Sequence, residues 1–338
     1  MTPVTVLTGF LGSGKTTLLN RLLQRPELAD TAVIINEFGA VGIDHLLVDH
    51  VDENMRVLAS GCLCCTVRGD LIETLATLAR RREEGEARFS RVIVETTGLA
   101  DPAPVLHTLM ADPAVNGAFK LDGVVTTVDA VNGLATLDRH PEAVKQVGVA
   151  DALLLTKTDL VDPAAVEGAV ERLLRLNPGA RLHCVHDGLV DPAEVLGIGW
   201  IDPLGRQPAH AGEEEYGHAH HDHHHHDVNR HSDRVRAHAF MFDAPLPRAA
   251  FLHWLELMAA LRGERLLRVK GLVQLAEEPG RPLVVHGVQH VFHPPRQLEA
   301  WPTQDRRTRL VFIVDGIERA EIERTFQKFV RTPEALAP

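Results

Sequence analysis

A segment near the N-terminus has the residue types and spacing of a phosphate-binding loop. Gly9–Thr17 reads Gly-Phe-Leu-Gly-Ser-Gly-Lys-Thr-Thr and matches the pattern G-x-x-x-x-G-K-[ST]. Glycines in this pattern let backbone N–H groups surround nucleotide phosphates, and the following helix adds a positive dipole. We expect Lys15 to reach the β- and γ-phosphates and Thr16 to hold Mg²⁺. The predicted nucleotide contacts are Gly9, Gly12, Ser13, Gly14, Lys15, Thr16 and Thr17.

The flanking sequence supports this interpretation against a glycine-rich turn that arose by chance. Val4–Thr8 is a short β-branched run that predicts a strand, and Thr16–Leu23 is compatible with a helix. A strand before the loop and a helix after it are the context in which the motif binds phosphate.

A second motif predicts which base is bound. Thr156, Lys157, Thr158 and Asp159 follow a predicted strand, Ala152–Leu155. Guanine presents two adjacent donors, N1–H and the 2-amino group, which one carboxylate can accept together. We therefore expect Asp159 to select GTP over ATP, the stem of Lys157 to cover the base, and Thr156 to occupy the position where many GTPases have Asn. The alternative is that Asp159 caps the next helix.

Acidic residues follow two other predicted strands. Glu95 ends the strand Arg91–Glu95, where phosphate-loop enzymes hold Mg²⁺ or its water, and Gly98 follows as a backbone donor to the γ-phosphate. Glu37 follows the strand Ala32–Asn36 and is either a metal contact or a solvated carboxylate. Together with Lys15 and Thr16, these two glutamates are the predicted catalytic group. Neither a water-orienting glutamine nor an arginine finger is identifiable in the sequence, which predicts slow hydrolysis.

Three cysteines lie within four positions. Cys62, Cys64 and Cys65 can direct soft thiolates at one ion such as Zn²⁺, but they cannot complete a tetrahedral shell alone. Glu37 is a candidate for the missing ligand, and Cys184 would have to join for an all-cysteine site. A reactive thiol at a helix start and buried packing cysteines are the alternatives.

Histidines dominate a segment further along the chain. We expect residues 203–234 to form a linker that binds Zn²⁺, Co²⁺, Ni²⁺ or Cu²⁺ loosely, because imidazoles there have no fixed geometry. A solvated linker without metal is the alternative. The predicted loose ligands are His218, His220, His221, His223, His224, His225 and His226.

The elements that position these motifs alternate between strands and helices. Strand-like runs of Val, Ile and Leu recur to about residue 185, with helices predicted at Asp70–Arg82, Ala103–Ala111 and Ala164–Leu176. This order predicts an α/β domain with a mostly parallel sheet over residues 1–202. After the linker, strands and helices alternate more densely over 235–332. They predict a smaller α+β domain, with helices on one antiparallel sheet.

Charge and composition limit the partners and the compartment. The chain of 338 residues has 35 Lys and Arg against 46 Asp and Glu, a formal charge of −11, which argues against a general nucleic-acid binder. No signal peptide or membrane-spanning run is recognisable, and clustered cysteines fit a reducing compartment. We therefore expect a cytoplasmic protein without membrane or nucleic-acid partners, whose oligomeric state stays open.

Taken together, the motifs resemble those of the CobW-like metal-chaperone GTPases. These proteins have a glutamate in the acidic motif, as at Glu95, and a C-terminal domain similar to the segments 267–271 and 286–290 here. The resemblance implies a P-loop GTPase that binds Zn²⁺ or a similar ion at the cysteine motif, couples metal to GTP, and passes the ion to a client protein. Many relatives have an acidic residue where this chain has Ala40. The alternatives are a GTP-binding metal buffer or sensor, and Co²⁺ delivery for cobalamin or nitrile hydratase maturation.

Overall fold

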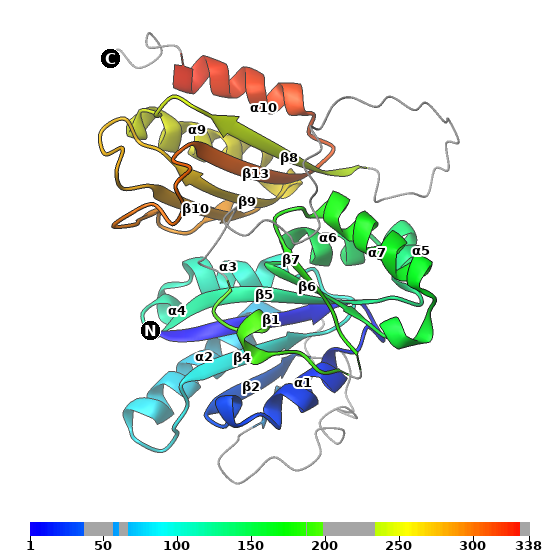
Figure 1. The fold of residues 1–338 in the computed structure, drawn as a ribbon. Coiled ribbons are helices and arrows are strands. Elements are labelled where there is room, and N and C mark those ends of the chain that lie inside the picture. Colours follow the sequence, from blue (N-terminus) through cyan, green and yellow to red (C-terminus); the bar gives the residue numbers. More distant parts are fainter. Residues whose placement is uncertain (37–56, 61–66, 187, 199–233, 332–338) are drawn as a thin grey trace.

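The structure is a computed structural model that describes residues 1–36, 57–60, 67–186, 188–198 and 234–331 (Figure 1). Within these residues, seven parallel strands form the N-terminal sheet in the order β3-β2-β4-β1-β5-β6-β7. Buried Val, Ile and Leu residues recur along these strands because both faces of the sheet are covered. The strands are β1 (Thr2–Gly9), β2 (Thr31–Asn36), β3 (Val57–Ser60), β4 (Arg91–Thr96), β5 (Phe119–Asp129), β6 (Ala152–Thr156) and β7 (Arg181–Cys184).

Helices cover the two faces of this sheet. On one face, α1 (Lys15–Leu23) and the short α8 (Pro192–Val195) share an apolar cluster with the sheet. On the other face lie α2 (Val67–Glu83), α3 (Ala103–Ala111), α6 (Pro141–Val149) and α7 (Pro163–Leu176). The connections on this side contain two shorter helices, α4 (Pro113–Asn116) and α5 (Gly133–Arg139). This arrangement is the predicted P-loop α/β fold.

The C-terminal domain is an antiparallel sheet with helices on one face, as predicted. Its strand order is β11-β10-β9-β13-β8, and β12 pairs with β10. Phe240, Phe312 and Val314 point toward α9 (Arg248–Arg262) and α10 (Arg319–Phe326), where Trp254 and Phe326 complete the cluster. The strands are β8 (Val235–Phe242), β9 (Leu266–Val273), β10 (Leu283–Val288), β11 (Val291–Phe292), β12 (Arg296–Gln297) and β13 (Thr308–Asp315).

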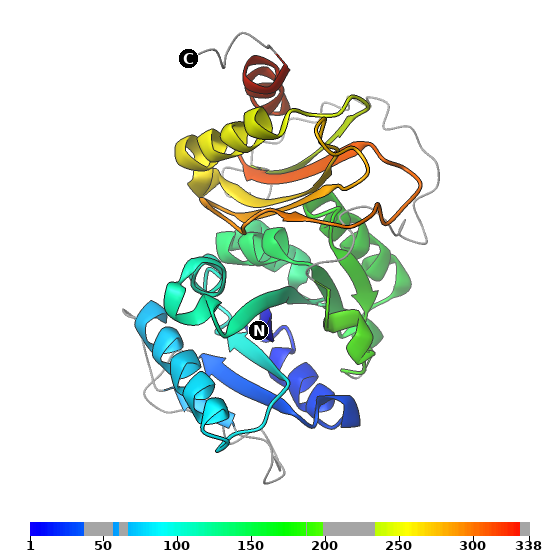
Figure 2. The ribbon, with the colours of Figure 1, turned by 90° about the vertical axis from the view of Figure 1, so that its left-hand side faces the viewer.

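The opposite face of the C-terminal sheet packs on the helices of the N-terminal domain. Figures 1 and 2 show this sheet lying directly over α3, α6 and α7. Because side chains alternate along a strand, Val311 and Ile313 face the N-terminal domain while Phe312 faces α9 and α10. Leu267 of β9 joins the same cluster with Val144 and Val147 of α6. One apolar cluster therefore contains residues of both domains.

A buried charge cluster lies within this interface. Asp151, between α6 and β6, is 3% exposed. It pairs with Arg268 of β9 at 2.7 Å and with Lys270, and it accepts a 2.8 Å hydrogen bond from the Val124 N–H. Burial alone would raise the pKa of the Asp151 carboxyl, but Arg268 and Lys270 hold it down at about 2. The aspartate thus stays ionised inside the protein.

The structure differs from the sequence-based expectation mainly between residues 130 and 150. No helix was expected there, yet α5 and α6 both form. Each is short, at 7 and 9 residues, and each begins at a glycine or proline that reads as a turn signal. The predicted strands of the N-terminal domain are present, with ends that differ by a few residues. The described residues contain no helix that is both long and apolar enough to cross a membrane.

Replacing Asp151 by Asn should lower the free energy of unfolding by about 3 kcal/mol or more at pH 7, because two buried cations lose their counter-charge. The folded-state pKa of this carboxyl, about 2, lies below its unfolded value. Its stabilisation is therefore complete above pH ~4 and is lost as the pH falls toward 2. Urea unfolding followed by circular dichroism should show the two proteins converging over that range.

The matched control is Asp112→Asn at the exposed N-cap of α4, where the side chain accepts a hydrogen bond from Ala114 N–H. This exposed substitution should change stability by less than about 1 kcal/mol. Equal stability of Asp151→Asn and the unmodified protein at pH 7 would contradict the role given to the charge cluster.

Candidate functional site

The predicted phosphate loop connects β1 to α1. Gly9 and Gly14 have φ angles of +142° and +94°, which favour glycine. A Cβ at Gly9 would also lie 2.4 Å from the Thr127 carbonyl oxygen of the neighbouring strand β5. Lys15 Nζ lies within the loop and donates to the carbonyls of Gly9 at 2.9 Å and Phe10 at 3.2 Å. The loop thus surrounds the lysine ammonium group that the motif places beside phosphates.

Beside the loop is a cavity of about 290 Å³ where several predicted site residues meet. Lys15, Thr16, Thr17, Glu95 and Gly98 all line it. Thr16 Oγ1 donates to Glu95 Oε1 at 3.0 Å, which joins the start of α1 to the end of β4. A hydroxyl and a carboxylate are oxygen ligands of the kind that Mg²⁺ prefers, so this pair fits the predicted magnesium position.

The turn after β4 requires its glycine. A Cβ on Gly98 would lie 2.6 Å from the backbone nitrogen of Leu11 in the phosphate loop, so any larger residue would displace the loop. The turn is also held from outside, because Gln146 of α6 donates to the carbonyls of Gly98 and Ala100. Gln146 was not among the residues identified from sequence, since its partner is 48 positions away.

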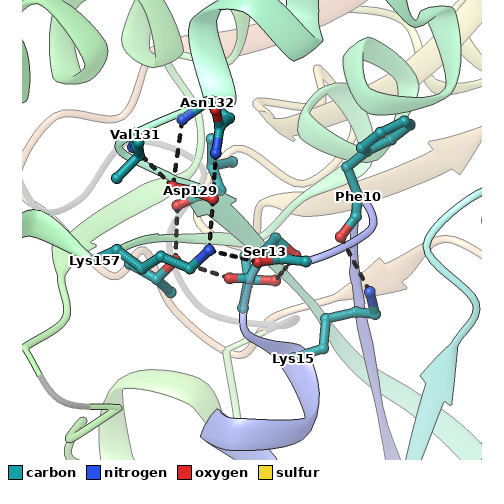
Figure 3. Close-up of polar contacts among 11 residues, drawn as sticks. Phe10, Ser13, Lys15, Asp129, Val131, Asn132 and Lys157 are labelled. Atoms are coloured by element: carbon teal, nitrogen blue, oxygen red, sulfur yellow. Dashed lines mark hydrogen bonds and ion pairs between the residues drawn. The ribbon is translucent and has the colours of Figure 1, made fainter. Parts of the chain in front are cut away.

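The guanine motif is tied to the phosphate loop (Figure 3). Thr156 Oγ1 donates to the Ser13 carbonyl at 2.8 Å, and the Ser13 hydroxyl lies 2.7 Å from Thr127 Oγ1. Lys157 has a left-handed backbone, with φ of 58°, and its Nζ donates to the Gly12 carbonyl at 2.8 Å. These contacts fix the start of the predicted base motif relative to the phosphate loop.

Asp129 is a further member of this group that sequence reasoning missed. Its carboxylate, at the end of β5, receives Lys157 Nζ at 2.6 Å and the N–H of Val131 at 2.7 Å (Figure 3). Burial favours a raised pKa, but the hydrogen bond from Lys157, with those from Val131 and Asn132, lowers the pKa of Asp129 overall. An acidic residue at the end of a predicted parallel strand was the available signal.

Asp159 lies in an exposed 3₁₀ turn, Thr158–Leu160. The capping alternative is wrong, because the N-cap of α7 is Asp162, whose side chain accepts from the Ala165 N–H at 2.8 Å. The preceding residue, Thr158, contacts His186, whose Nδ1 lies 3.0 Å from the threonine hydroxyl.

The predicted transition-metal ligands lie outside the described residues. These are Glu37, Cys62, Cys64, Cys65 and the histidines His218, His220, His221, His223, His224, His225 and His226. Among the residues that the structure does describe, no group of three His, Cys, Asp or Glu side chains could hold a metal ion.

The strand ends that lead into the metal motifs are nevertheless described. Asn36, which precedes Glu37, is in register with Ser60 of β3 and with Thr96 of β4. Cys184 ends β7, at the opposite edge of the sheet from β3. With ~4.8 Å between neighbouring strands, six spacings put these edges roughly 29 Å apart. Cys184 therefore does not complete an all-cysteine site next to β3.

Asp129→Asn should weaken GTP binding about tenfold, because Lys157 loses the charged partner that holds it across the phosphate loop. The substitution keeps an oxygen for the Val131 N–H, so the turn after β5 should survive. Isothermal titration calorimetry measures the change in dissociation constant. Asp162→Asn, an equally conservative change at the α7 N-cap, is the control and should bind GTP normally. Unchanged affinity in Asp129→Asn would show that this ion pair does not organise the site.

Comparison with known proteins identifies the family. Residues 3–183 match the CobW/HypB/UreG nucleotide-binding domain, and residues 235–330 match the cobalamin synthesis protein cobW C-terminal domain. The zinc chaperone YjiA of Escherichia coli is 32% identical over 96% of this chain and 97% of its own. The zinc-regulated GTPase metalloprotein activator 1 of Schizosaccharomyces pombe is 36% identical over 58% of this chain and 49% of its own.

A solved structure agrees with this match over nearly the whole chain. The crystal structure of Zn(II)-bound YjiA GTPase from E. coli has a TM-score of 0.71 and 27% identity, covering 97% of this chain and 98% of its own. The resemblance and the fold class expected from sequence are confirmed, and the predicted GTPase activity agrees with the names of these relatives. The chain belongs to the CobW family of nucleotide-binding proteins, with both its nucleotide-binding domain and its C-terminal domain.

Proposed function

We propose that this protein is a GTPase that couples GTP binding and hydrolysis to the holding of Zn²⁺ and its delivery to a client protein. One observation carries the proposal. The cavity lined by Lys15, Thr16, Glu95 and Gly98 lies at the carboxyl ends of the parallel strands. The carboxyl ends of β2 and β3 lie on the same side of the sheet. The chain continues from those strand ends into Glu37 and into the cysteine motif. Relatives named as zinc chaperones and as a zinc-regulated GTPase support this assignment.

In the proposed nucleotide site, the phosphates bind the loop Gly9–Thr17 and Lys15 neutralises charge at the β- and γ-phosphates. Thr16 and Glu95 would hold Mg²⁺ or its water, which would supply charge neutralisation at the phosphates. The base binds at Thr156, Lys157 and Asp159. Because no arginine finger is identifiable in the sequence, we expect intrinsic hydrolysis to be slow.

In the proposed metal site, thiolates of Cys62, Cys64 and Cys65 bind the ion together with Glu37. The ion is cargo, so an incomplete protein shell suits its release. A coupling of about 1–3 kcal/mol between metal and γ-phosphate is ordinary for linked sites and acts in both directions. The thiols must lose protons to bind, so acidic pH weakens metal loading.

The remaining assignments follow from the same chemistry. Residues 1–202 form the GTPase domain, 203–234 the His-rich linker that collects metal loosely, and 235–332 the C-terminal domain. The relatives' names favour Zn²⁺ over Co²⁺ or Ni²⁺ as the ion. Thiolate ligands need a reducing environment, so the cytoplasm is the proposed compartment. The client is a metalloprotein that takes up the ion.

Asp159→Asn should abolish the preference for GTP over other nucleotides, because the amide no longer offers two acceptor oxygens to N1–H and the 2-amino group. Competition binding with GTP, XTP and ATP measures this preference. The expected result is GTP affinity lower by about tenfold or more, with relative gain for the xanthine base, as charged hydrogen bonds of this strength imply. Retained GTP preference would mean that another residue selects the base. Asp162→Asn is the control.

GTP turnover of chelator-stripped protein should rise on titration with Zn²⁺, and less with Co²⁺. Cys64→Ser should remove this response while leaving basal turnover intact, because serine is a poor ligand for the ion. Cys184→Ser, at the far edge of the sheet, is the matched control and should respond normally. Turnover indifferent to both ions in the unmodified protein would instead favour a metal buffer or sensor.

A further inference from the structure

Helix α6 holds the turn that follows Glu95. Gln146, which is 1% exposed, donates through Nε2 to the Gly98 carbonyl at 3.1 Å and to the Ala100 carbonyl at 3.0 Å. The neighbouring Lys145 pairs with Asp101 at 2.7 Å. Two adjacent residues of one helix therefore clamp the segment whose first residue lines the nucleotide cavity.

The orientation of the Gln146 amide is determined by its partners. Both are carbonyl oxygens, so only the nitrogen end can face them. The other end, Oε1, is buried and has no hydrogen-bond partner among the described residues. A buried acceptor without a partner reduces stability. The side chain therefore makes its hydrogen bonds through Nε2 alone, and both go to the turn.

The end of the same helix contacts the C-terminal domain. Gly148 packs so closely on β9 and β13 that a Cβ there would lie 3.2 Å from Leu267 and 3.4 Å from Ile313. Asp151, five positions after Gln146, is paired with Arg268 and Lys270 of β9. Asn177 of the loop after α7 secures this end, donating to the carbonyls of Val147 at 2.8 Å and Ala150 at 3.0 Å.

We propose that Gln146 is a positioning residue for the turn that faces the γ-phosphate, and that through it α6 links this turn to the docked C-terminal domain. The proposal rests on the GTPase function proposed above. GTP reaches the turn through its γ-phosphate and GDP does not, so the clamp acts on one nucleotide only. Because linkage is reciprocal, docking of the C-terminal sheet then biases GTP binding, and GTP biases docking.

The first test is Gln146→Met, which preserves volume but removes both donors. Affinity for a non-hydrolysable GTP analogue should fall about tenfold, the loss expected for two ordinary hydrogen bonds, while GDP affinity changes by less than about twofold. GTP turnover should fall with the analogue affinity. Thr108→Val removes a buried hydroxyl that bonds within α3 and is the matched control. Equal weakening of both nucleotides, or of neither, would overturn the positioning role.

A second variant avoids the buried position. Lys145→Met breaks the pair with Asp101 at a side chain that is 36% exposed, so the fold should tolerate it. It should lower affinity for the GTP analogue by about threefold without affecting GDP, as a partly exposed ion pair allows. No change in the ratio of the two affinities would contradict the clamp even if Gln146→Met did not fold.

The link to the C-terminal domain is tested by a double-mutant cycle with Arg268→Met. This change weakens the docking contact while leaving Lys270 beside Asp151. When Gln146 is intact, Arg268→Met should lower the ratio of GTP-analogue affinity to GDP affinity. In the Gln146→Met background, it should have little further effect on that ratio. Additive effects would overturn the link. An unmodified protein that does not bind GTP would instead refute the proposed function, which keeps the two failures distinct.

Discussion

The ionised carboxylate of Asp151 is the constraint on which the relation between the two domains depends. A charge buried this completely is tolerated only beside opposite charge, and that charge comes from Arg268 and Lys270 on the C-terminal sheet. Burial also lowers the pKa of the neighbouring His286 and, with Arg268, that of His293 to about 4. Both imidazoles are therefore neutral near pH 7 and add no further positive charge. The cations that pair with Asp151 both belong to the C-terminal domain, so this buried carboxylate is stabilised only when the two domains are packed together.

The same constraint determines what α6 can do. The helix has 9 residues, and one end is bound to the C-terminal sheet while its side chains hold the turn at Gly98. Such a short, packed element transmits displacement because it cannot shift at either contact without opening buried contacts at the other. Under the proposed function, a displacement of the C-terminal sheet would reach the nucleotide site by this route.

The sequence identified the residues proposed to contact nucleotide, but it did not identify the residues that hold them in place. The phosphate loop, Glu95, Gly98 and Asp159 belong to contiguous motifs with fixed spacing, and the buried parallel strands read as runs of Val, Ile and Leu. Asp129 and Gln146 carry no such signal, because their partners lie 28 and 48 positions away and are brought close only by the fold. Helices α5 and α6 were not predicted for a related reason. Their stability comes from packing rather than from periodicity, because α6 lies between the two sheets and α5 packs on α6 and α7.

Preorganisation also explains how two loops far apart in sequence can bind one nucleotide. Thr156 and Lys157 bond to the carbonyls of Ser13 and Gly12, and Asp129 fixes the lysine between them. The base motif and the phosphate loop are therefore aligned before ligand binds, which reduces the ordering cost of association. In the proposed site, the γ-phosphate lies on the other side of the cavity, where Gly98 is held by α6. The proposed base site is therefore held by contacts within the N-terminal domain, whereas the proposed γ-phosphate site includes a turn that α6 joins to the C-terminal domain.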